Sequence, residues 1–259
     1  MKLILNEPLK PGTGIIITTP FRVKIPGSFS RMGHVGQAYQ ITQWYPKPAV
    51  YDAQGWHPIP YLDQGEFYSE FGSFDVYITL PKNYVVGATG NLQNADELAW
   101  LHHLADSTKN LSTFDNDISF PVSSTQTKTL HYMQDNVHDF GWFCDKRYHV
   151  LCGSVELPYS HRKVTTWVMF TNHHSNSWKG AIQYVNDAVY DYSSWLGDYP
   201  YDNCTALQGA LEAGGGMEYP TITVISADAS PKGLDIVIAH EVGHNWLYGI
   251  LGFNEREHP

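Results

Sequence analysis

The spacing of the hydrophobic residues changes once along this chain of 259 residues, near residue 140. Before that point hydrophobic and polar residues alternate, most clearly over residues 73–80, which is the pattern of a half-buried β-strand. After it, hydrophobic residues recur at intervals of three and four over residues 178–196, which is the pattern of an amphipathic helix. The sequence therefore predicts an α+β chain with a β-rich first part and a mixed second part.

Clusters of Gly, Pro, Asn and Asp separate the other expected elements. The long helix is expected to be capped by Ser175 or Ser177 and to end at Gly197. A last helix is expected to begin at Ser230, which a proline follows, and to run to about Gly249. In the first part we expect strands at 14–18, 38–45, 84–88 and 129–133, and strands at this spacing are typical of a sandwich. In the second part we expect strands at 164–170, 205–211 and 221–226.

The composition excludes two classes of partner. Acidic residues outnumber basic ones by 26 to 16, which gives a formal net charge of −10. A sequence-independent nucleic-acid binder needs a basic surface, so we exclude nucleic acid, and the same charge argues against docking on anionic membranes. We predict no membrane span, because no apolar run approaches the necessary length, and the first residues do not form a secretory signal. The cellular compartment is left open.

The three cysteines do not form a disulfide framework. Cys144, Cys152 and Cys204 are odd in number, and none of them belongs to a C-x-x-C motif. We favour three partly buried thiols, and a Cys144–Cys152 disulfide is the alternative.

The last predicted helix carries an H-E-x-x-H motif at residues 240–244. Residues at i and i+4 share one helical face, so His240 and His244 can bind one zinc ion through one ring nitrogen each. Glu241 can then reach water at the metal and act as a general base. The alternative is a pair of ordinary helix histidines.

Two further segments carry candidate binding residues. Glycines at 214–216 precede Glu218, which allows a ligand to approach the backbone beside a carboxylate, and the alternative is a solvated glycine-rich turn. Residues 36–46 are polar and aromatic and could line a cleft, although the residues alone indicate only a strand that runs into a loop. The adjacent histidine pairs at 102–103 and 173–174 are expected at the surface, because neighbouring side chains diverge.

Together these segments resemble the gluzincin aminopeptidases, the family that includes aminopeptidase N and leukotriene hydrolase. Residues 215–218 resemble its G-x-M-E-N motif, some two dozen residues before a zinc helix similar to 240–246. Residues 195–201 resemble its F-G-x-Y-P turn, and the segment around Gln37 is similar to the part that supplies a substrate-binding glutamine. Tyr219 stands where the family motif has Asn, which changes the first side-chain pocket.

The resemblance implies an N-terminal antiparallel β-sandwich domain at 1–147, incomplete at its start. The first part of a thermolysin-like zinc-metallopeptidase domain would follow at 148–259. It implies a zinc-dependent aminopeptidase that acts on peptides with a free N-terminus. His240 and His244 would bind the single zinc ion, and Glu241 would be the general base.

The resemblance also assigns substrate-binding residues. Glu218 would bind the α-ammonium group of the substrate, so a blocked N-terminus would leave this carboxylate unpaired. Gly215 and Gly216 would let the substrate backbone lie alongside, and Gln37 would add a hydrogen bond to the ammonium.

In the family pattern H-E-x-x-H-x18-E, the third zinc ligand falls at position 263, beyond Pro259. The catalytic tyrosine of the family would also lie further on. We therefore interpret the chain as an internal fragment of a longer enzyme. Glu255, Glu257 and His258 are internal alternatives for the third ligand.

Two other functions stay open. One is a non-catalytic β-sandwich binding fragment of a decayed or truncated peptidase, and the other is an enzyme similar to the epoxide hydrolases of the family. The intact H-E-x-x-H favours a peptidase, because decay usually removes the Glu or a His. Oligomeric state is not predicted. On the last helix we expect Trp246, Leu247, Ile250 or Leu251 to be partly exposed.

Overall fold

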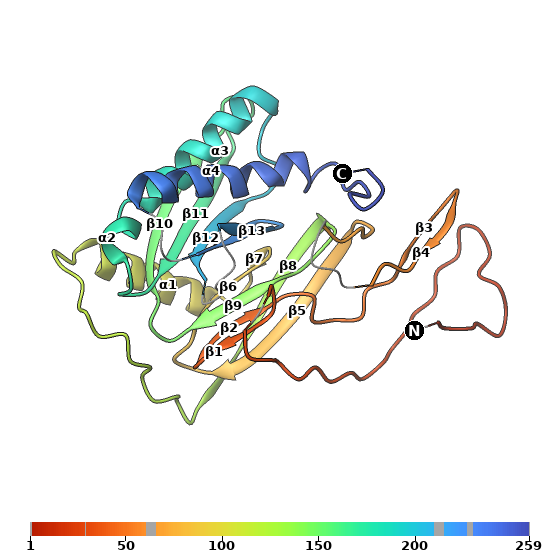
Figure 1. Ribbon diagram of the computed structural model, residues 1–259, viewed down its shortest axis with the longest axis horizontal. Coiled ribbons are helices and arrows are strands. Elements are labelled where there is room, and N and C mark those ends of the chain that lie inside the picture. The colour runs from red at the N-terminus through yellow and green to blue at the C-terminus, as the bar shows by residue number, and fades with distance from the viewer. Residues whose placement is uncertain (1, 29, 61–65, 210–214, 227–229, 259) are drawn as a thin grey trace.

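The computed structural model describes residues 2–28, 30–60, 66–209, 215–226 and 230–258, and within them the chain forms β-sheets and helices (Figure 1). The sheets have the strand orders β1-β2-β9-β6, β5-β8-β7, β3-β4 and β10-β11-β12-β14-β13. All named strand pairs are antiparallel except β11–β12 and β12–β14, which are parallel. The expected α+β class is thus confirmed as a mixed, sheet-rich chain.

Two sheets of the first part face each other across a buried cluster that contains Ile78 and Leu130 from one sheet and Val86 and Cys144 from the other. Along β5, Ile78 is buried and its neighbour Tyr77 is exposed, so the alternation expected over 73–80 is confirmed. The strands of this part are β1 (Gly33–Val35), β2 (Ala38–Ile41), β3 (Val50–Asp52), β4 (Gly55–His57), β5 (Gly72–Pro81), β6 (Val85–Ala88), β7 (Asn91–Leu92), β8 (Thr127–Val137) and β9 (Trp142–Asp145).

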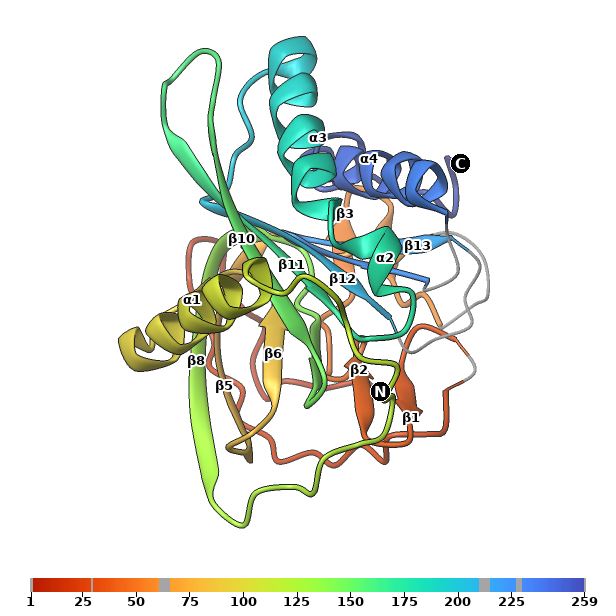
Figure 2. The same cartoon turned by 90° about the vertical axis from the view of Figure 1, so that its left-hand side faces the viewer.

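The five-stranded sheet is buried on both faces. Its strands are β10 (His149–Glu156), β11 (Lys163–Phe170), β12 (Asn203–Gln208), β13 (Gly216–Tyr219) and β14 (Ile222–Ile225). The helices are α1 (Ala95–Lys109), α2 (Ser175–Trp178), α3 (Ala181–Leu196) and α4 (Pro231–Leu247). On β11, Val168 and Phe170 pack with residues of α3 and α4, whereas Trp167 and Met169 pack with residues of α1. Helices α3 and α4 therefore cover one face and α1 the other (Figure 2).

Some expected elements differ from the observed ones. No strand forms at 14–18, where Ile16 is 93% exposed and no strand of the described residues pairs with the backbone. Helix α1 was not expected at all. The caps expected at Ser175 and Ser177 are wrong, because the helical stretch is interrupted before Gly180, which precedes α3. The stop at Gly197 is confirmed, with a φ of 105° that favours glycine.

Three further sequence predictions concern the cysteines, a membrane span and the domain boundary. Cys144, Cys152 and Cys204 are free thiols, as favoured. The described residues contain no helix that is both long enough and apolar enough to cross a membrane. The predicted division at 147 lies in the short connection between β9 and β10, and the separation into two domains stays a prediction.

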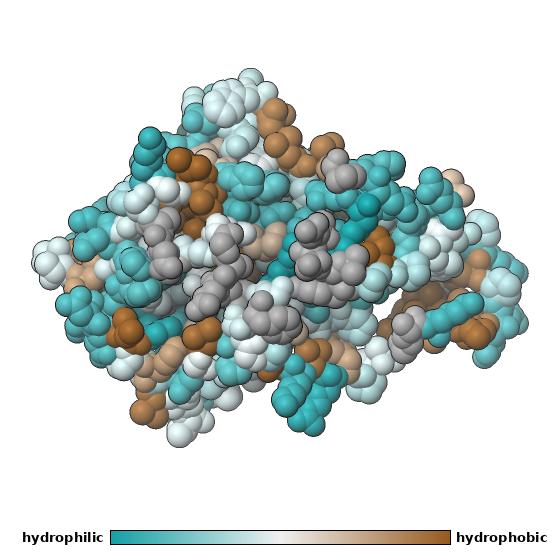
Figure 3. Space-filling view, viewed as in Figure 1, coloured by the Kyte–Doolittle hydropathy of each residue, from teal (hydrophilic) through white to brown (hydrophobic). Residues whose placement is uncertain are grey.

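Apolar side chains at the end of the last helix are exposed. Leu247 is 53% exposed, Ile250 46% and Leu251 62%, and small hydrophobic patches appear near the ends of α3 and α4 (Figure 3). Trp246 is only 5% exposed, because its indole packs inward and donates a 2.9 Å hydrogen bond to the carbonyl oxygen of Gly197.

Candidate active site

Helix α4 begins as the sequence predicts. Ser230 accepts a hydrogen bond from the Gly233 backbone N–H at 3.2 Å and precedes Pro231, the first helical residue. Leu234, Ile238 and Val242 lie at i, i+4 and i+8 and are fully buried in the cluster shared with α3. This packing fixes the rotation of α4 about its axis and turns another side of the helix toward β13.

The two histidines of the H-E-x-x-H motif face each other across one helical turn. The Nε2 atoms of His240 and His244 lie 3.2 Å apart, and their ring planes are nearly perpendicular at 88°. Two nitrogens bound to one tetrahedral zinc ion would lie about 3.3 Å apart, so the spacing fits a shared ion. Burial and the adjacent His240 lower the pKa of His244, which favours the neutral imidazole that binds metals.

Glu241 is buried beside these histidines, with an exposure of only 4%. Burial raises its pKa to about 7. Its Oε2 atom is buried and has no hydrogen-bond partner among the described residues, an arrangement that costs stability unless a ligand, water or proton satisfies the oxygen. A Cβ atom at Gly216 would lie 2.6 Å from Oε1 of Glu241, so any other residue type here would displace the Glu241 side chain.

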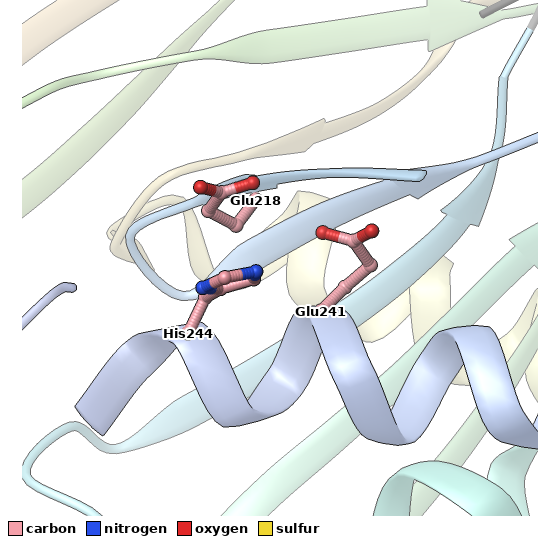
Figure 4. Close-up of side chains that lie close together, drawn as sticks. All are labelled: Glu218, Glu241 and His244. Carbon is pink, nitrogen blue, oxygen red and sulfur yellow. The ribbon is translucent and has the colours of Figure 1, made fainter. Parts of the chain in front are cut away.

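The side chain of Glu218, on β13, lies close to those of Glu241 and His244 (Figure 4). The possible ligand atoms of Glu218, Glu241 and His244 all lie within 4.8 Å of one another. Burial, and then the nearby charge of Glu66, raise the pKa of Glu218 to about 9. Two buried carboxyl groups this close do not both ionise readily at neutral pH, and a bound cation favours ionisation of both.

The side chains around His244 therefore fit a zinc ion: the His240 imidazole converges on it, and the carboxyl groups of Glu218 and Glu241 lie close by. His240 itself contacts His244 but is not part of the group that His244 forms with the two carboxyl groups. The internal alternatives for a third ligand do not join this group within the described ranges. Glu255 accepts a 3.4 Å hydrogen bond from the Glu66 backbone N–H. The Oε1 atom of Glu257 lies 3.9 Å from the Nδ1 atom of His57. His258 is exposed. A third ligand beyond Pro259 stays a prediction.

Gly215 is constrained by its backbone conformation, whereas Tyr219 is constrained by core packing. Gly215 adopts a φ of 91°, and a Cβ atom there would meet nothing within 4 Å, so backbone conformation rather than space favours glycine. Tyr219 is 5% exposed and packs on Phe143, within the core cluster on the α1 side of the sheet.

Sequence reasoning missed three residues near the site. Arg31 binds the carboxylate of Glu66 through both terminal nitrogens, one at 2.6 Å, and Glu66 in turn raises the pKa values of Glu218 and Glu241. Tyr248 is buried, and its hydroxyl donates a 2.9 Å hydrogen bond to the carbonyl oxygen of Phe67. Tyr248 lies at i+4 from His244, and that spacing was the one available signal.

Gln37 lies apart from this group in its contacts. It occupies the turn between β1 and β2 and is exposed. Its amide oxygen accepts hydrogen bonds from the ammonium of Lys146 and, at 3.4 Å, from the hydroxyl of Ser123. A contact between Gln37 and a substrate ammonium stays a prediction.

Comparisons with known proteins give structural likeness only. No protein-family model matches the chain, and no curated protein matches it. A point variant of an M1 zinc metallopeptidase from Deinococcus radiodurans is similar over 84% of this chain and 42% of its own length, with 13% identity and a TM-score of 0.48. Another structure of an M1 zinc metallopeptidase from that organism is similar over 69% of this chain and 35% of its own, with 15% identity and a TM-score of 0.43.

A variant of a two-domain M1 zinc metallopeptidase bound to L-arginine is similar over 69% of this chain and 34% of its own, with 16% identity and a TM-score of 0.46. The chain thus spans well under half the length of these structures. At such identities and TM-scores the likeness does not decide what the site does.

Proposed function

We propose that the chain carries the metal-binding part of a zinc-dependent aminopeptidase, which hydrolyses the first peptide bond of peptides with a free N-terminus. The observation that carries the proposal is the approach of His240 and His244, with Nε2 atoms 3.2 Å apart, where His244 also lies beside the carboxyl groups of Glu218 and Glu241. Buried polar atoms are usually hydrogen-bonded, so the free Oε2 atom of Glu241 beside His244 is available to a general base in a hydrolytic metal site.

In this proposal His240 and His244 hold the zinc ion. Zinc, when bound, supplies Lewis-acid polarisation of a carbonyl group and lowers the pKa of water. Glu241 accepts a proton from the attacking water at its free Oε2 atom and delivers it to the leaving amine. Without a bound cation, burial raises the pKa of Glu241 to about 7, and a nearby cation would favour the charged form that accepts the proton.

Glu218 binds the α-ammonium group of the substrate in this proposal. A cation beside Glu218 replaces the solvation that burial removed, and it shifts the carboxyl group from its neutral form to its charged form. An N-acetylated peptide offers no cation and leaves the buried carboxyl group without a partner. The site would therefore select for free N-termini, because only a substrate with an ammonium group forms an ion pair with Glu218.

The first test is the zinc content of the purified chain, measured beside hydrolysis of aminoacyl anilides. We expect one zinc ion per chain, lost in His240→Ala and retained in His102→Ala, which removes a histidine of α1. Little retained zinc together with no hydrolysis would reject the proposal for this chain and favour the non-catalytic binding fragment.

The second test separates the two roles open to Glu218. We expect Glu218→Gln to keep its zinc and to lose the preference for free over N-acetylated substrates. Loss of zinc in Glu218→Gln would instead assign Glu218 to the metal, as a third protein ligand within this chain.

A further inference from the structure

The turn between β13 and β14 connects Glu218 to the rest of the site. β13 and β14 pair in antiparallel register, with Tyr219 opposite Ile222, so Pro220 and Thr221 alone form the turn. Thr221 is fully buried and adopts a φ of 65°. A β-branched residue with positive φ is strained, and such a conformation persists only where the surrounding structure holds it.

Three hydrogen bonds hold Thr221 from three directions. Its backbone N–H donates to Oδ1 of Asn245 on α4 at 3.1 Å. Its carbonyl oxygen accepts from the backbone N–H of Thr205 on β12 at 2.9 Å. Its hydroxyl oxygen accepts from the backbone N–H of Gly90, between β6 and β7, at 2.8 Å. Of these contacts, only the one from Asn245 comes from the helix that carries the histidines.

The amide of Asn245 is itself fixed. The side chain is 5% exposed, and its Nδ2 donates to the carbonyl oxygen of Val242 at 3.0 Å, which aims Oδ1 at the turn. The hydroxyl of Tyr199 donates to the same Oδ1 at 3.4 Å. Tyr199 is fully buried and belongs to the Gly-Asp-Tyr-Pro segment that follows α3, so that segment supports Asn245.

We propose that Asn245 is a positioning residue, which sets the distance between Glu218 and the two histidines through its hydrogen bond to Thr221. Asn245 directly follows His244, and Thr221 lies three residues after Glu218, so one hydrogen bond couples the two halves of the site. Misplacement of a binding group by about 1 Å can cost on the order of a hundredfold in rate. The inference rests on the proposed function, in which Glu218 binds the substrate ammonium.

The test uses the full chain loaded with Co²⁺, and its variants are Asn245→Leu, Asn245→Asp and Asn203→Leu. Asn203 is the matched control, a buried amide on β12 that donates to Asn91 at 2.8 Å and, among the described residues, accepts no hydrogen bond from the Thr221 amide. Three quantities are measured: the Co²⁺ stoichiometry, the hydrogen exchange rate of the Thr221 amide, and the ratio of affinities for L-leucinamide and N-acetyl-L-leucinamide.

For Asn245→Leu we expect unchanged Co²⁺ stoichiometry, exchange of the Thr221 amide at least roughly tenfold faster, and a roughly tenfold smaller affinity ratio. Asn245→Asp keeps an acceptor oxygen for the Thr221 amide but loses the donor to Val242, so its exchange rate and its affinity ratio should fall between those of the wild type and those of Asn245→Leu. Asn203→Leu should change neither quantity. If Asn245→Leu does not fold, Asn245→Ala is measured in its place with the same expectations.

An unchanged exchange rate at Thr221 in the folded Asn245 variant would overturn the proposal, and so would faster exchange with an unchanged affinity ratio. Equal affinities of the wild-type chain for the two ligands would instead reject the proposed function. The exchange rates are informative in that case too, because they report the hydrogen bond whether or not Glu218 binds an ammonium group.

Discussion

Helices α4 and α1 cover opposite faces of the same sheet, yet they place their polar side chains differently. On α4 the histidines are one turn apart and converge, with Nε2 atoms at 3.2 Å, and Glu241 beside them is 4% exposed. On α1 the adjacent His102 and His103 are both exposed. Spacing along the helix thus decides whether two histidines can share a ligand.

The two helices also differ in how their polar atoms are satisfied. Before α1, the side-chain oxygen of Asn94 accepts from the His131 backbone N–H at 2.7 Å, and within the helix Ser107 donates to the His103 carbonyl oxygen at 2.8 Å. On α4 one buried oxygen of Glu241 has no partner among the described residues. The polar groups of α1 hold the helix in place, whereas the free oxygen of Glu241 on α4 costs stability unless a ligand, water or proton satisfies it.

The largest expected effect is on catalysis. If the chain hydrolyses aminoacyl anilides, Glu241→Gln should lower kcat by roughly 10²- to 10⁴-fold, because a general base contributes that much. Glu97→Gln on α1 is the control and should leave kcat unchanged. Zinc content is measured on the same samples, and an active Glu241→Gln variant with full zinc would remove Glu241 from the mechanism.

The packing of the two helices gives the next effect. Ile238→Ala on α4 deletes a fully buried side chain and should lower the free energy of unfolding by about 2–5 kcal/mol. Leu98→Ala on α1 removes a side chain that is 36% exposed and should cost less than about 1 kcal/mol. Urea titrations of both variants measure the difference, and equal costs would show that α1 is packed as tightly as α4.

Local sequence signals predicted α4 well. Ser230, Pro231 and the H-E-x-x-H spacing define its start and its functional face, and the resemblance placed Glu218 with them. These features depend on neighbours within a few residues, or on one short motif. Helix α1 was missed because it lies between polar segments and packs through few side chains, such as Leu101 and Ala105.

The contacts of Glu66 and Arg31 could not be read from the sequence. Their ion pair joins residues 35 positions apart, and its position near Glu218 depends on how the sheets pack. The expected strand at 14–18 failed for the opposite reason. Its local β-branched pattern is strong, but a strand forms only where a neighbouring strand offers hydrogen bonds.

His138 is a buried histidine that is not one of the proposed zinc ligands. His138, at the end of β8, is 3% exposed and packs against Tyr248 with ring centroids 4.5 Å apart. Burial lowers its pKa from 6.5 to about 4, although Asp139 opposes this shift and Lys47 adds to it. Between these values the unfolded chain binds a proton that the folded chain does not.

The contribution of His138 should therefore be complete above pH 6.5 and be lost as the pH falls to about 4, by up to about 3 kcal/mol. His138→Phe should flatten this part of the stability curve. His161→Phe is the control, because the His161 side chain is 74% exposed. An unchanged pH dependence in His138→Phe would show that the pKa of His138 is the same in the folded and the unfolded chain.

The smallest expected effect concerns the ion pair that attaches α1 to β8. Lys128 contacts Glu97 and donates to the Tyr84 carbonyl oxygen at 2.6 Å, and both charged side chains are only 11% exposed. Despite their contact, burial raises the pKa of Glu97 and lowers that of Lys128, so desolvation outweighs their attraction.

Replacement of both, as Glu97→Leu with Lys128→Met, should change the free energy of unfolding by less than about 1 kcal/mol in either direction. Each single replacement should cost more than the double one, because it leaves one buried charge unpaired. A double variant that is less stable than both single variants, measured in urea, would mean that the ion pair stabilises α1, and the contrast with α4 would then lie only in the unsatisfied oxygen of Glu241.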